Sequence, residues 1–148
     1  MEDSVGFWGS GPFENDEAMD LIDEINDESA TVEERCEMLR RALVVASEPD
    51  SLLTVRDGAS AVAAAAIVAS NVASTDPLVG EFSEWVDVSV AVDSETVVLA
   101  IKALRAAVGS WSELLNLAIE SKFEDELRES VNVILVALGA TPISTPWL

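Results

Sequence analysis

The stretch from Gly58 to Thr75 contains no charged residue, and it includes four consecutive alanines, Ala63 to Ala66. A helix that is apolar on every side lies in the interior of a protein, where other helices pack around it. Alanine side chains let those neighbours approach closely. A membrane span is disfavoured, because the stretch is short, contains Ser70 and Asn71 and has no basic flank. The sequence therefore predicts a buried central helix, with Asp57 as its N-cap.

Two amphipathic helices are predicted before this central helix. The first begins at Asn15, a better N-cap than its neighbour Glu14, and its apolar residues recur at the spacing of one helix face. The second begins at the capping box Thr31–Glu34 and ends at Pro49. The residues expected to be buried in these two helices are Ala18, Leu21, Ile22, Ile25, Val32, Cys36, Leu39, Leu43 and Ala46.

Three further helices are predicted after the central one. The first is capped by Asp93 or Ser94 and stops at Gly109. Capping boxes at Ser110–Glu113 and Ser121–Glu124 begin the next two, and the last helix ends at Gly139. The residues expected to be buried in these three helices are Val97, Ile101, Leu104, Val108, Trp111, Leu114, Leu115, Ala118, Phe123, Leu127, Val131, Ile134, Leu135 and Leu138.

Less regular segments flank and link these helices. Residues 80–86 are consistent with a short helix. Residues 86–92 alternate like a strand but have no evident partner strand, so that an extended loop is favoured and a strand is the alternative. Residues 140–148 are expected to form an extended tail that packs back. The sum is one all-α domain over residues 1–148, a bundle of about six or seven helices around the alanine-rich helix.

An aromatic arm is predicted over residues 1–13, because its glycines and its proline prevent a regular helix. Trp8 and Phe13 in this arm have two interpretations. They are either anchors that insert into a partner, or rings that pin the arm to the bundle. The Gly-x-Gly-Pro spacing around them favours the second interpretation.

The charge of the chain is strongly one-sided, with 28 acidic against 8 basic residues and a formal net charge of -20. This excess argues against nucleic acid as a direct ligand, since like charges would repel during the encounter. It suits a basic partner, or it serves solubility alone. No basic residue precedes Arg35, and one face of the first predicted helix is acidic. The residues expected to bind a partner are Asp16, Glu17, Asp20, Asp23, Glu24, Asp27 and Glu28.

Enzyme chemistry has little support in this composition. The chain contains no histidine, and its single cysteine, Cys36, lies on an apolar helix face, so that no histidine-activated nucleophile is available. The glycines near Trp8 are not followed by the Lys-Ser or Lys-Thr of a phosphate loop. A metal site would have to be built from carboxylates alone, and the spacing of a calcium loop is absent. We therefore expect no cofactor, no metal and no catalytic residue.

The compartment follows from cysteine usage and from the beginning of the chain. One cysteine cannot form an intrachain disulfide, which is simplest in a reducing compartment. The acidic start, Met1 to Ser4, lacks the basic and apolar regions of a signal peptide. We expect a cytoplasmic protein that does not enter a membrane.

The segment Trp8 to Ala18 reads Trp-Gly-Ser-Gly-Pro-Phe-Glu-Asn-Asp-Glu-Ala. It resembles the opening of an uncharacterised bacterial family of small, acidic, helical proteins, which begin W-G-x-G-P-F-x-N-D-x-A. The alanines 63–66 and the later Ser112-Glu113-Leu114 agree with that family in their order. The resemblance implies a domain of unknown function and transfers no catalytic residue. Families of this kind occur beside mobile elements and toxin systems, which implies some preference for a binding role.

These observations lead to one favoured hypothesis and two alternatives. The favoured one is a non-enzymatic interaction protein whose acidic first helix binds a basic protein, in its sharpest form an inhibitor or immunity protein that blocks a toxin or nuclease. The first alternative is a salt-adapted cytosolic helical protein whose acidity serves solubility. The second is an enzyme that works with carboxylates, which requires a concave site and an acid of raised pKa.

Overall fold

The computed structural model describes residues 16–27, 30–47, 52–72 and 92–143. Within these ranges the chain forms six helices and no strand, so that the prediction of an all-α bundle is confirmed. The helices are α1 (Asp16–Ile25), α2 (Val32–Ser47), α3 (Val55–Val72), α5 (Ser94–Ala107), α6 (Glu113–Glu120) and α7 (Glu124–Ala137). The predictions for the aromatic arm with Trp8 and Phe13, for residues 76–91 and for residues 144–148 lie outside the described residues.

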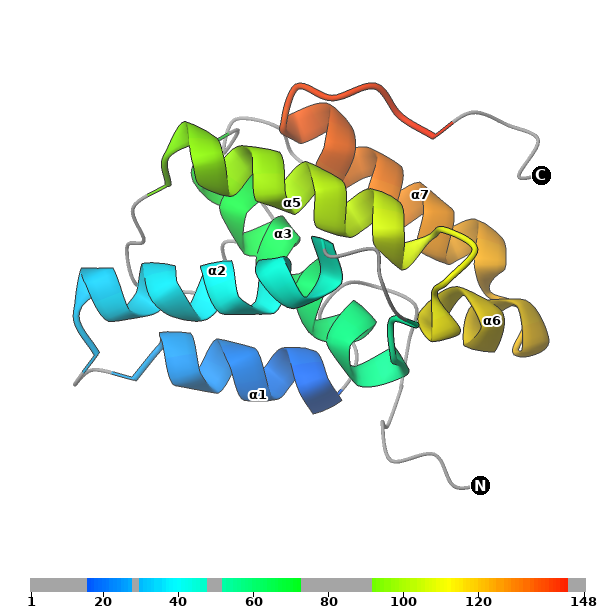
Figure 1. Cartoon of the computed structure of the whole chain (residues 1–148), viewed down its shortest axis with the longest axis horizontal. Coiled ribbons are helices and arrows are strands. Elements are labelled where there is room, and N and C mark those ends of the chain that lie inside the picture. The colour runs from blue at the N-terminus through cyan, green and yellow to red at the C-terminus, as the bar shows by residue number, and fades with distance from the viewer. Residues whose placement is uncertain (1–15, 28–29, 48–51, 73–91, 144–148) are drawn as a thin grey trace.

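Helix α3 is the centre of the bundle. It packs against each of the other five described helices, and every residue from Ala61 to Ser70 is buried. Figure 1 shows α1 and α2 side by side along one edge, α5 and α7 along the opposite edge, and α3 passing between and behind them. None of the described helices is both long enough and apolar enough to cross a membrane. The alanine-rich helix therefore has the central position that its uncharged sequence predicts.

The N-terminus of α3 differs from the prediction. The helix begins at Val55, and the Thr54 side chain caps it by accepting a hydrogen bond of 3.2 Å from the backbone N–H of Asp57. Asp57 is thus a residue of the first turn rather than the cap. Its carboxylate still lies near the positive end of the helix dipole, where negative charge is stabilised.

The prediction for α1 and α2 is largely confirmed. In α1 the four apolar residues of the predicted face are buried, and in α2 the same is true of Leu39, Leu43 and Ala46. The capping box forms as expected, because the Glu34 N–H donates to the Thr31 hydroxyl at 3.0 Å and the Thr31 N–H donates to the Glu34 carboxylate at 2.8 Å. The first turn of α2 was predicted wrongly.

In that first turn, Val32 is 43% exposed, Cys36 is half-buried, and the side chain of Arg35 is buried instead. An arginine can replace an apolar residue at a buried position when its donors find carbonyl acceptors there. Arg35 has two such acceptors at the end of α1, as described below.

The buried face of α5 is rotated relative to the predicted one. Leu104 and Val108 are buried as expected, but Val97 and Ile101 are only partly buried. Apart from Leu104, the residues that α5 buries are small, namely Thr96, Ala100, Ala103 and Ala107. The predicted face was the one with the large apolar side chains. Close packing of α5 against its neighbouring helices instead favours small side chains at the contact. The predicted cap at Asp93 is confirmed, because its carboxylate accepts from the Thr96 N–H at 2.8 Å.

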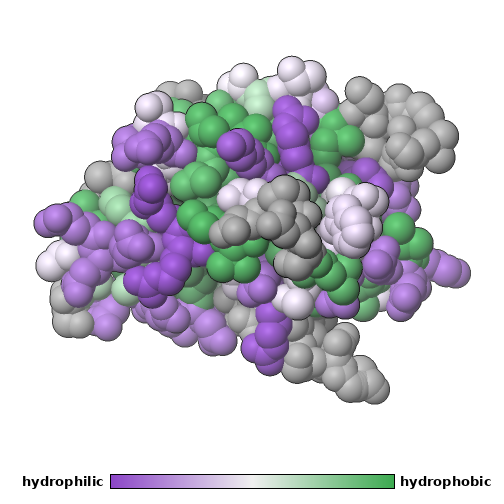
Figure 2. All heavy atoms as spheres, viewed as in Figure 1, coloured by the Kyte–Doolittle hydropathy of each residue, from purple (hydrophilic) through white to green (hydrophobic). Residues whose placement is uncertain are grey.

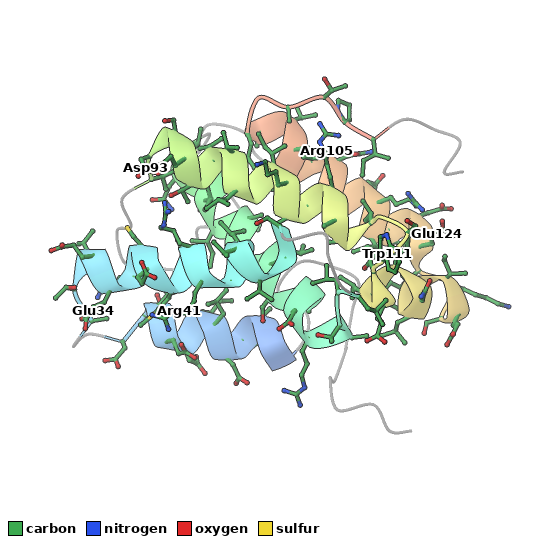
Figure 3. All side chains as sticks on the ribbon, in the orientation of Figure 1. Glu34, Arg41, Asp93, Arg105, Trp111 and Glu124 are labelled. Carbon is green, nitrogen blue, oxygen red and sulfur yellow. The ribbon has the colours of Figure 1, made fainter. Side chains whose placement is uncertain are left out.

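Helix α6 begins two residues later than its predicted capping box implies. The N-cap is Ser112, which is fully buried, and its hydroxyl accepts from the Leu115 N–H at 3.1 Å and donates to the Ala107 carbonyl at 2.6 Å. Trp111 therefore lies in the turn before the helix and is 62% exposed, which contradicts its predicted burial (Figure 3). Residues 111–113 pair instead with Leu53 through an isolated parallel bridge.

Helix α7 also lacks its predicted capping box. Its N-cap is Phe123, which makes no side-chain capping bond. Its C-terminus ends as predicted at Gly139, whose φ of 84° is the left-handed conformation that glycine adopts without strain. The N–H groups of Gly139 and Ala140 donate to the carbonyls of Val136 and Leu135, a Schellman arrangement that satisfies the helix end.

The start of the predicted tail packs back onto the bundle. The Asn132 side chain on α7 accepts from the Ile143 N–H at 2.7 Å and donates to the Ile143 carbonyl at 3.4 Å. Arg105 on α5 donates to the Thr141 carbonyl at 3.0 Å (Figure 3). Residues 140–143 are therefore held by side chains of two helices, in agreement with the prediction for this part of the tail.

Candidate functional site

The acidic face of α1 is held in place by the buried apolar face of the same helix. Ala18, Leu21, Ile22 and Ile25 are between 0% and 8% exposed and belong to the hydrophobic core. The helix period then directs the remaining positions to the other side. The acidic residues of α1 and its C-terminal extension whose side chains the structure describes are all exposed, namely Asp20, Asp23, Glu24 and Asp27.

The remaining predicted partner-binding residues are placed less completely. Asp16 and Glu17 lie in the first turn of α1, but their side chains are outside the described part of the structure, as is Glu28. For the four described acids, the exposure is what a binding face requires. Whether the face binds a partner stays a prediction.

Arg35 fixes the C-terminal end of α1. Its Nε donates to the Ile25 carbonyl at 2.9 Å, and its Nη2 donates to the Asp27 carbonyl at 3.1 Å. The last carbonyls of a helix have no partner within the helix and carry the negative end of its dipole. The guanidinium of Arg35 therefore satisfies the Ile25 carbonyl at the end of α1 and the Asp27 carbonyl just beyond it.

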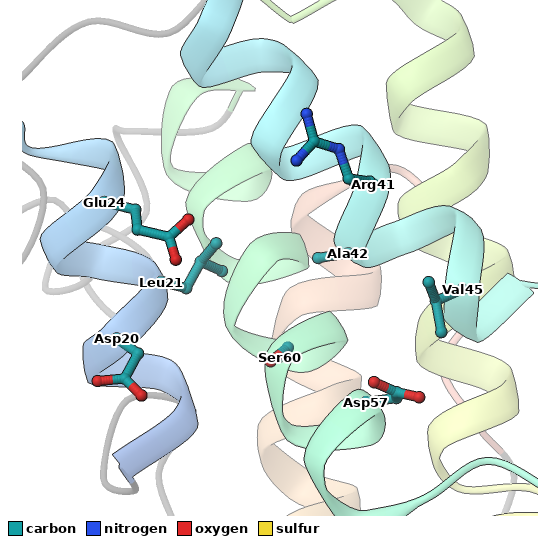
Figure 4. Close-up of a pocket in the computed structure, with 8 residues that line it drawn as sticks. All are labelled: Asp20, Leu21, Glu24, Arg41, Ala42, Val45, Asp57 and Ser60. Carbon is teal, nitrogen blue, oxygen red and sulfur yellow. The ribbon is translucent and has the colours of Figure 1, made fainter. Parts of the chain in front are cut away.

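A groove of about 250 Å³ lies beside this face, where α1, α2 and α3 meet (Figure 4). Its apolar part comes from Leu21 of α1 together with Ala42 and Val45 of α2. Ser60 of α3 contributes a hydroxyl. Leu21 is 8% exposed, so that the floor of the groove is continuous with the protein core.

Four charged side chains surround this apolar floor. Asp20 and Glu24 lie one helical turn apart on α1, Asp57 lies in the first turn of α3, and Arg41 projects from α2 (Figure 4). Glu24 extends over Leu21 toward the middle of the groove. Three carboxylates against one guanidinium leave the groove with a negative excess. Such a lining favours a cationic group that also carries apolar carbon.

Further carboxylates extend the negative surface onto α2. Glu33, Glu34 and Glu37 are exposed near the beginning of that helix. Figure 2 shows the hydrophilic side chains gathered on the side of the molecule that α1 and α2 form. The acidic surface is thus contributed by two neighbouring helices and is broader than the predicted face of α1 alone.

A second groove, of about 380 Å³, lies between α2 and α5. Val44, Val98 and Leu99 form its apolar lining, with Arg40 and Glu95 at its sides. Nearby, the pKa of the Asp93 carboxyl is lowered, first by the hydroxyl and then by the N–H of Thr96. Because those bonds cap α5, the lowered pKa reflects helix capping and not a catalytic acid.

A comparison with family models identifies the chain. The model for a domain of unknown function, DUF4259, matches residues 6–130, which is most of the length of the chain. The chain belongs to the DUF4259 family. This confirms the resemblance to an uncharacterised family. No curated protein and no solved structure matches the chain.

DUF4259 membership gives the chain a family without assigning it an activity, so that the site is described by its geometry alone. Sequence reasoning found the acids of α1 but missed Arg41, Asp57 and Ser60 as parts of one groove. A weak signal was present, because Ala42 and Val45 are apolar residues outside the predicted buried face of α2. Their position across from α1 depends on how the helices pack, which the sequence does not show.

Proposed function

We propose that this DUF4259 protein is a non-enzymatic interaction module that binds a basic protein through the acidic face of α1. In the sharpest form of the proposal, it is an inhibitor or immunity protein that blocks a cationic toxin or nuclease. The observation that carries the proposal is the division of α1 into two sides. One side is buried in the core, and the other presents Asp20, Asp23, Glu24 and Asp27 to solvent.

The electrostatics of the chain support the same proposal. With a net charge of -20, the protein attracts basic partners from a distance and repels nucleic acid. Complementary charge raises association rates and discriminates against wrong partners more than it raises affinity. Because α1 is fixed by Arg35 and by its apolar face, the helix backbone that carries the carboxylates needs no ordering step on binding.

The test compares two charge-reversal variants with the wild-type protein. Asp20→Lys combined with Asp23→Lys reverses the acidic face. Glu120→Lys combined with Glu129→Lys makes the same change of net charge on exposed positions of α6 and α7. Immobilised wild-type protein captures candidate partners from a lysate of the organism that encodes the chain, and each purified candidate is then measured for association rate at several salt concentrations.

The proposal expects a basic partner whose association with the wild-type protein slows steeply as salt rises. For this partner, the Asp20/Asp23 variant associates at least about tenfold more slowly at low salt, and the Glu120/Glu129 variant stays within about threefold of wild type. If the partner is an enzyme, its activity falls on binding. A partner that ignores the Asp20/Asp23 reversal, or that is not basic, contradicts the proposal.

One observation favours a second candidate, a salt-adapted protein whose acidity serves solubility. Exposed carboxylates also occur on helices remote from α1, including Glu95 on α5, Glu120 on α6 and Glu126 on α7. A salt titration of the wild-type protein, followed by circular dichroism, separates the two candidates. Salt adaptation predicts that helix content is lost as salt is removed, through repulsion among carboxylates. The interaction module predicts that the fold persists.

A further inference from the structure

We infer that the groove between α1, α2 and α3 receives one arginine side chain of the basic partner, and that this groove is the specific contact within the acidic face. The inference rests on the proposed function, because it names the group that the same face would recognise. It is carried by two features that occur together, an apolar floor and a negative rim. Either feature alone is common on protein surfaces, and only the combination selects a particular side chain.

The floor of the groove matches the aliphatic part of an arginine. Leu21, Ala42 and Val45 present only carbon, and they come from two helices that face each other across the groove. The three methylene groups of an arginine would lie against this surface and lose contact with water there. Val45 is 48% exposed and so has unburied apolar surface that such a contact would cover.

The rim of the groove matches the guanidinium. Asp20 and Glu24 stand on α1 and Asp57 stands at the start of α3, so that acceptors come from different sides of the opening (Figure 4). A planar guanidinium has five N–H donors and can bind several carboxylate oxygens at once, whereas a lysine ammonium is a single point charge. Acceptors from two helices therefore favour arginine over lysine.

Arg41 of α2 adds a limit to this recognition. Among the described residues that line the groove it is the single basic one, and its positive charge repels the charge of an incoming guanidinium. This repulsion lowers the gain from binding a cation in the groove. Replacing Arg41 by methionine keeps a stem of similar length and removes this repulsion.

The experiment uses the full chain and a small probe, the N-acetyl, N′-methylamide derivative of arginine, titrated into isotope-labelled protein and followed by NMR chemical shifts. The control probe is the citrulline derivative, which has nearly the same shape and no charge. The result expected is a saturable shift of the backbone amides of groove residues with the arginine probe. These residues are Asp20, Leu21, Glu24, Ala42, Val45, Asp57 and Ser60. The citrulline probe should produce shifts at least about tenfold weaker at equal concentration.

Three variants test the two features of the groove separately. Asp20→Asn with Glu24→Gln removes rim charge and should weaken arginine binding about three- to tenfold. Ala42→Leu fills the floor without a change of charge and should weaken it to a similar degree. Arg41→Met should strengthen it about threefold. A proton NMR spectrum with the dispersion of the wild-type protein establishes that each variant is folded.

Each outcome decides the inference. Shifts spread over exposed acids on every helix, equal shifts with the citrulline probe, or binding that is unaffected by Ala42→Leu would overturn the arginine groove. Such results leave the proposed function intact if the Asp20/Asp23 reversal still slows a basic partner. Conversely, arginine can bind in the groove while no basic partner depends on the acidic face, in which case the proposed function fails and the groove stands.

Discussion

The contact that holds the end of α1 can be tested by replacing Arg35 with methionine. Methionine keeps much of the apolar stem, so that the variant removes mainly the two hydrogen bonds to the carbonyls of Ile25 and Asp27, at 2.9 and 3.1 Å. A hydrogen bond from a charged donor contributes about 1.5–3 kcal/mol to stability. The Asp27 carbonyl keeps a second donor, the Ala30 N–H at 3.1 Å. This remaining hydrogen bond reduces the stability that is lost when the bond from Arg35 is removed.

We therefore expect Arg35→Met to lower the free energy of unfolding by about 2–3 kcal/mol. For a domain of this size that corresponds to a fall in Tm of about 4–12 °C. Urea unfolding followed by circular dichroism measures the change in free energy, and calorimetry measures the change in Tm. Hydrogen exchange should also show faster opening of the α1 amides than of the α3 amides.

The matched control is Arg41→Met, on the same helix and with the same change of charge. The Arg41 side chain is exposed, and its replacement should change the free energy of unfolding by no more than about 0.5 kcal/mol. Both variants change the formal net charge from -20 to -21, so that general repulsion cancels in the comparison. If Arg35→Met is no less stable than Arg41→Met, then Arg35 does not hold α1, and the capping argument is wrong.

Two further predictions concern helix caps. Ser112→Ala removes a fully buried hydroxyl that bonds both the Ala107 carbonyl and the Leu115 N–H, and it should lower the free energy of unfolding in urea by about 1–3 kcal/mol; an unchanged midpoint would contradict this role. The lowered pKa of Asp93 means that its contribution to stability is present above the unfolded-state pKa near 3.8 and is lost as pH falls through the lower folded-state pKa. Asp93→Asn should therefore make the free energy of unfolding, measured in urea, depend less steeply on pH in the acid range. A pH dependence as steep as that of the wild-type protein would disprove the role of the Asp93 carboxylate as a cap.

The helices and most of the core could be predicted from the sequence because they follow from local patterns. The spacing of apolar residues identifies the buried faces of α1 and α7 correctly. The lack of charged residues in α3 predicts its central position. The capping box at Thr31–Glu34 and the cap at Asp93 also depend on neighbours in the sequence. Interactions of this kind are decided within one or two helical turns, so that no knowledge of packing is needed.

The errors in the fold occur where a contact distant in sequence decides the outcome. The sequence predicts Ser110 as the cap of α6, whereas the structure has Ser112. The position of Ser112 depends on its bond to the Ala107 carbonyl and on the bridge to Leu53, which the sequence does not show. Trp111 lies in that turn and is exposed, although a tryptophan at this spacing is typical of a buried face. In α5 most of the buried positions are alanines, because close contact with neighbouring helices favours small side chains over the larger ones that define an apolar stripe.

The candidate site divides in the same way. The exposed acids of α1 were predictable from helix periodicity alone. The burial of Arg35 was not, because its acceptors belong to the preceding helix. The groove was not predictable either, since it requires the start of α3 to lie beside the middle of α1. Asp57 and Asp20 are far apart in the sequence, and only the packing of α1 on α3 places both at one opening.

The buried alanines of α3 restrict substitution in the core of the bundle much more than substitution on its surface. From Ala61 to Ser70 every position is enclosed, and in a close-packed interface an added methyl or methylene group displaces a neighbouring helix. The outward sides of α1 and α2 carry no such restriction. Under the proposed function, partner binding could therefore be redesigned there, or diversify among relatives, by exchanging surface carboxylates while the helices that carry them stay the same.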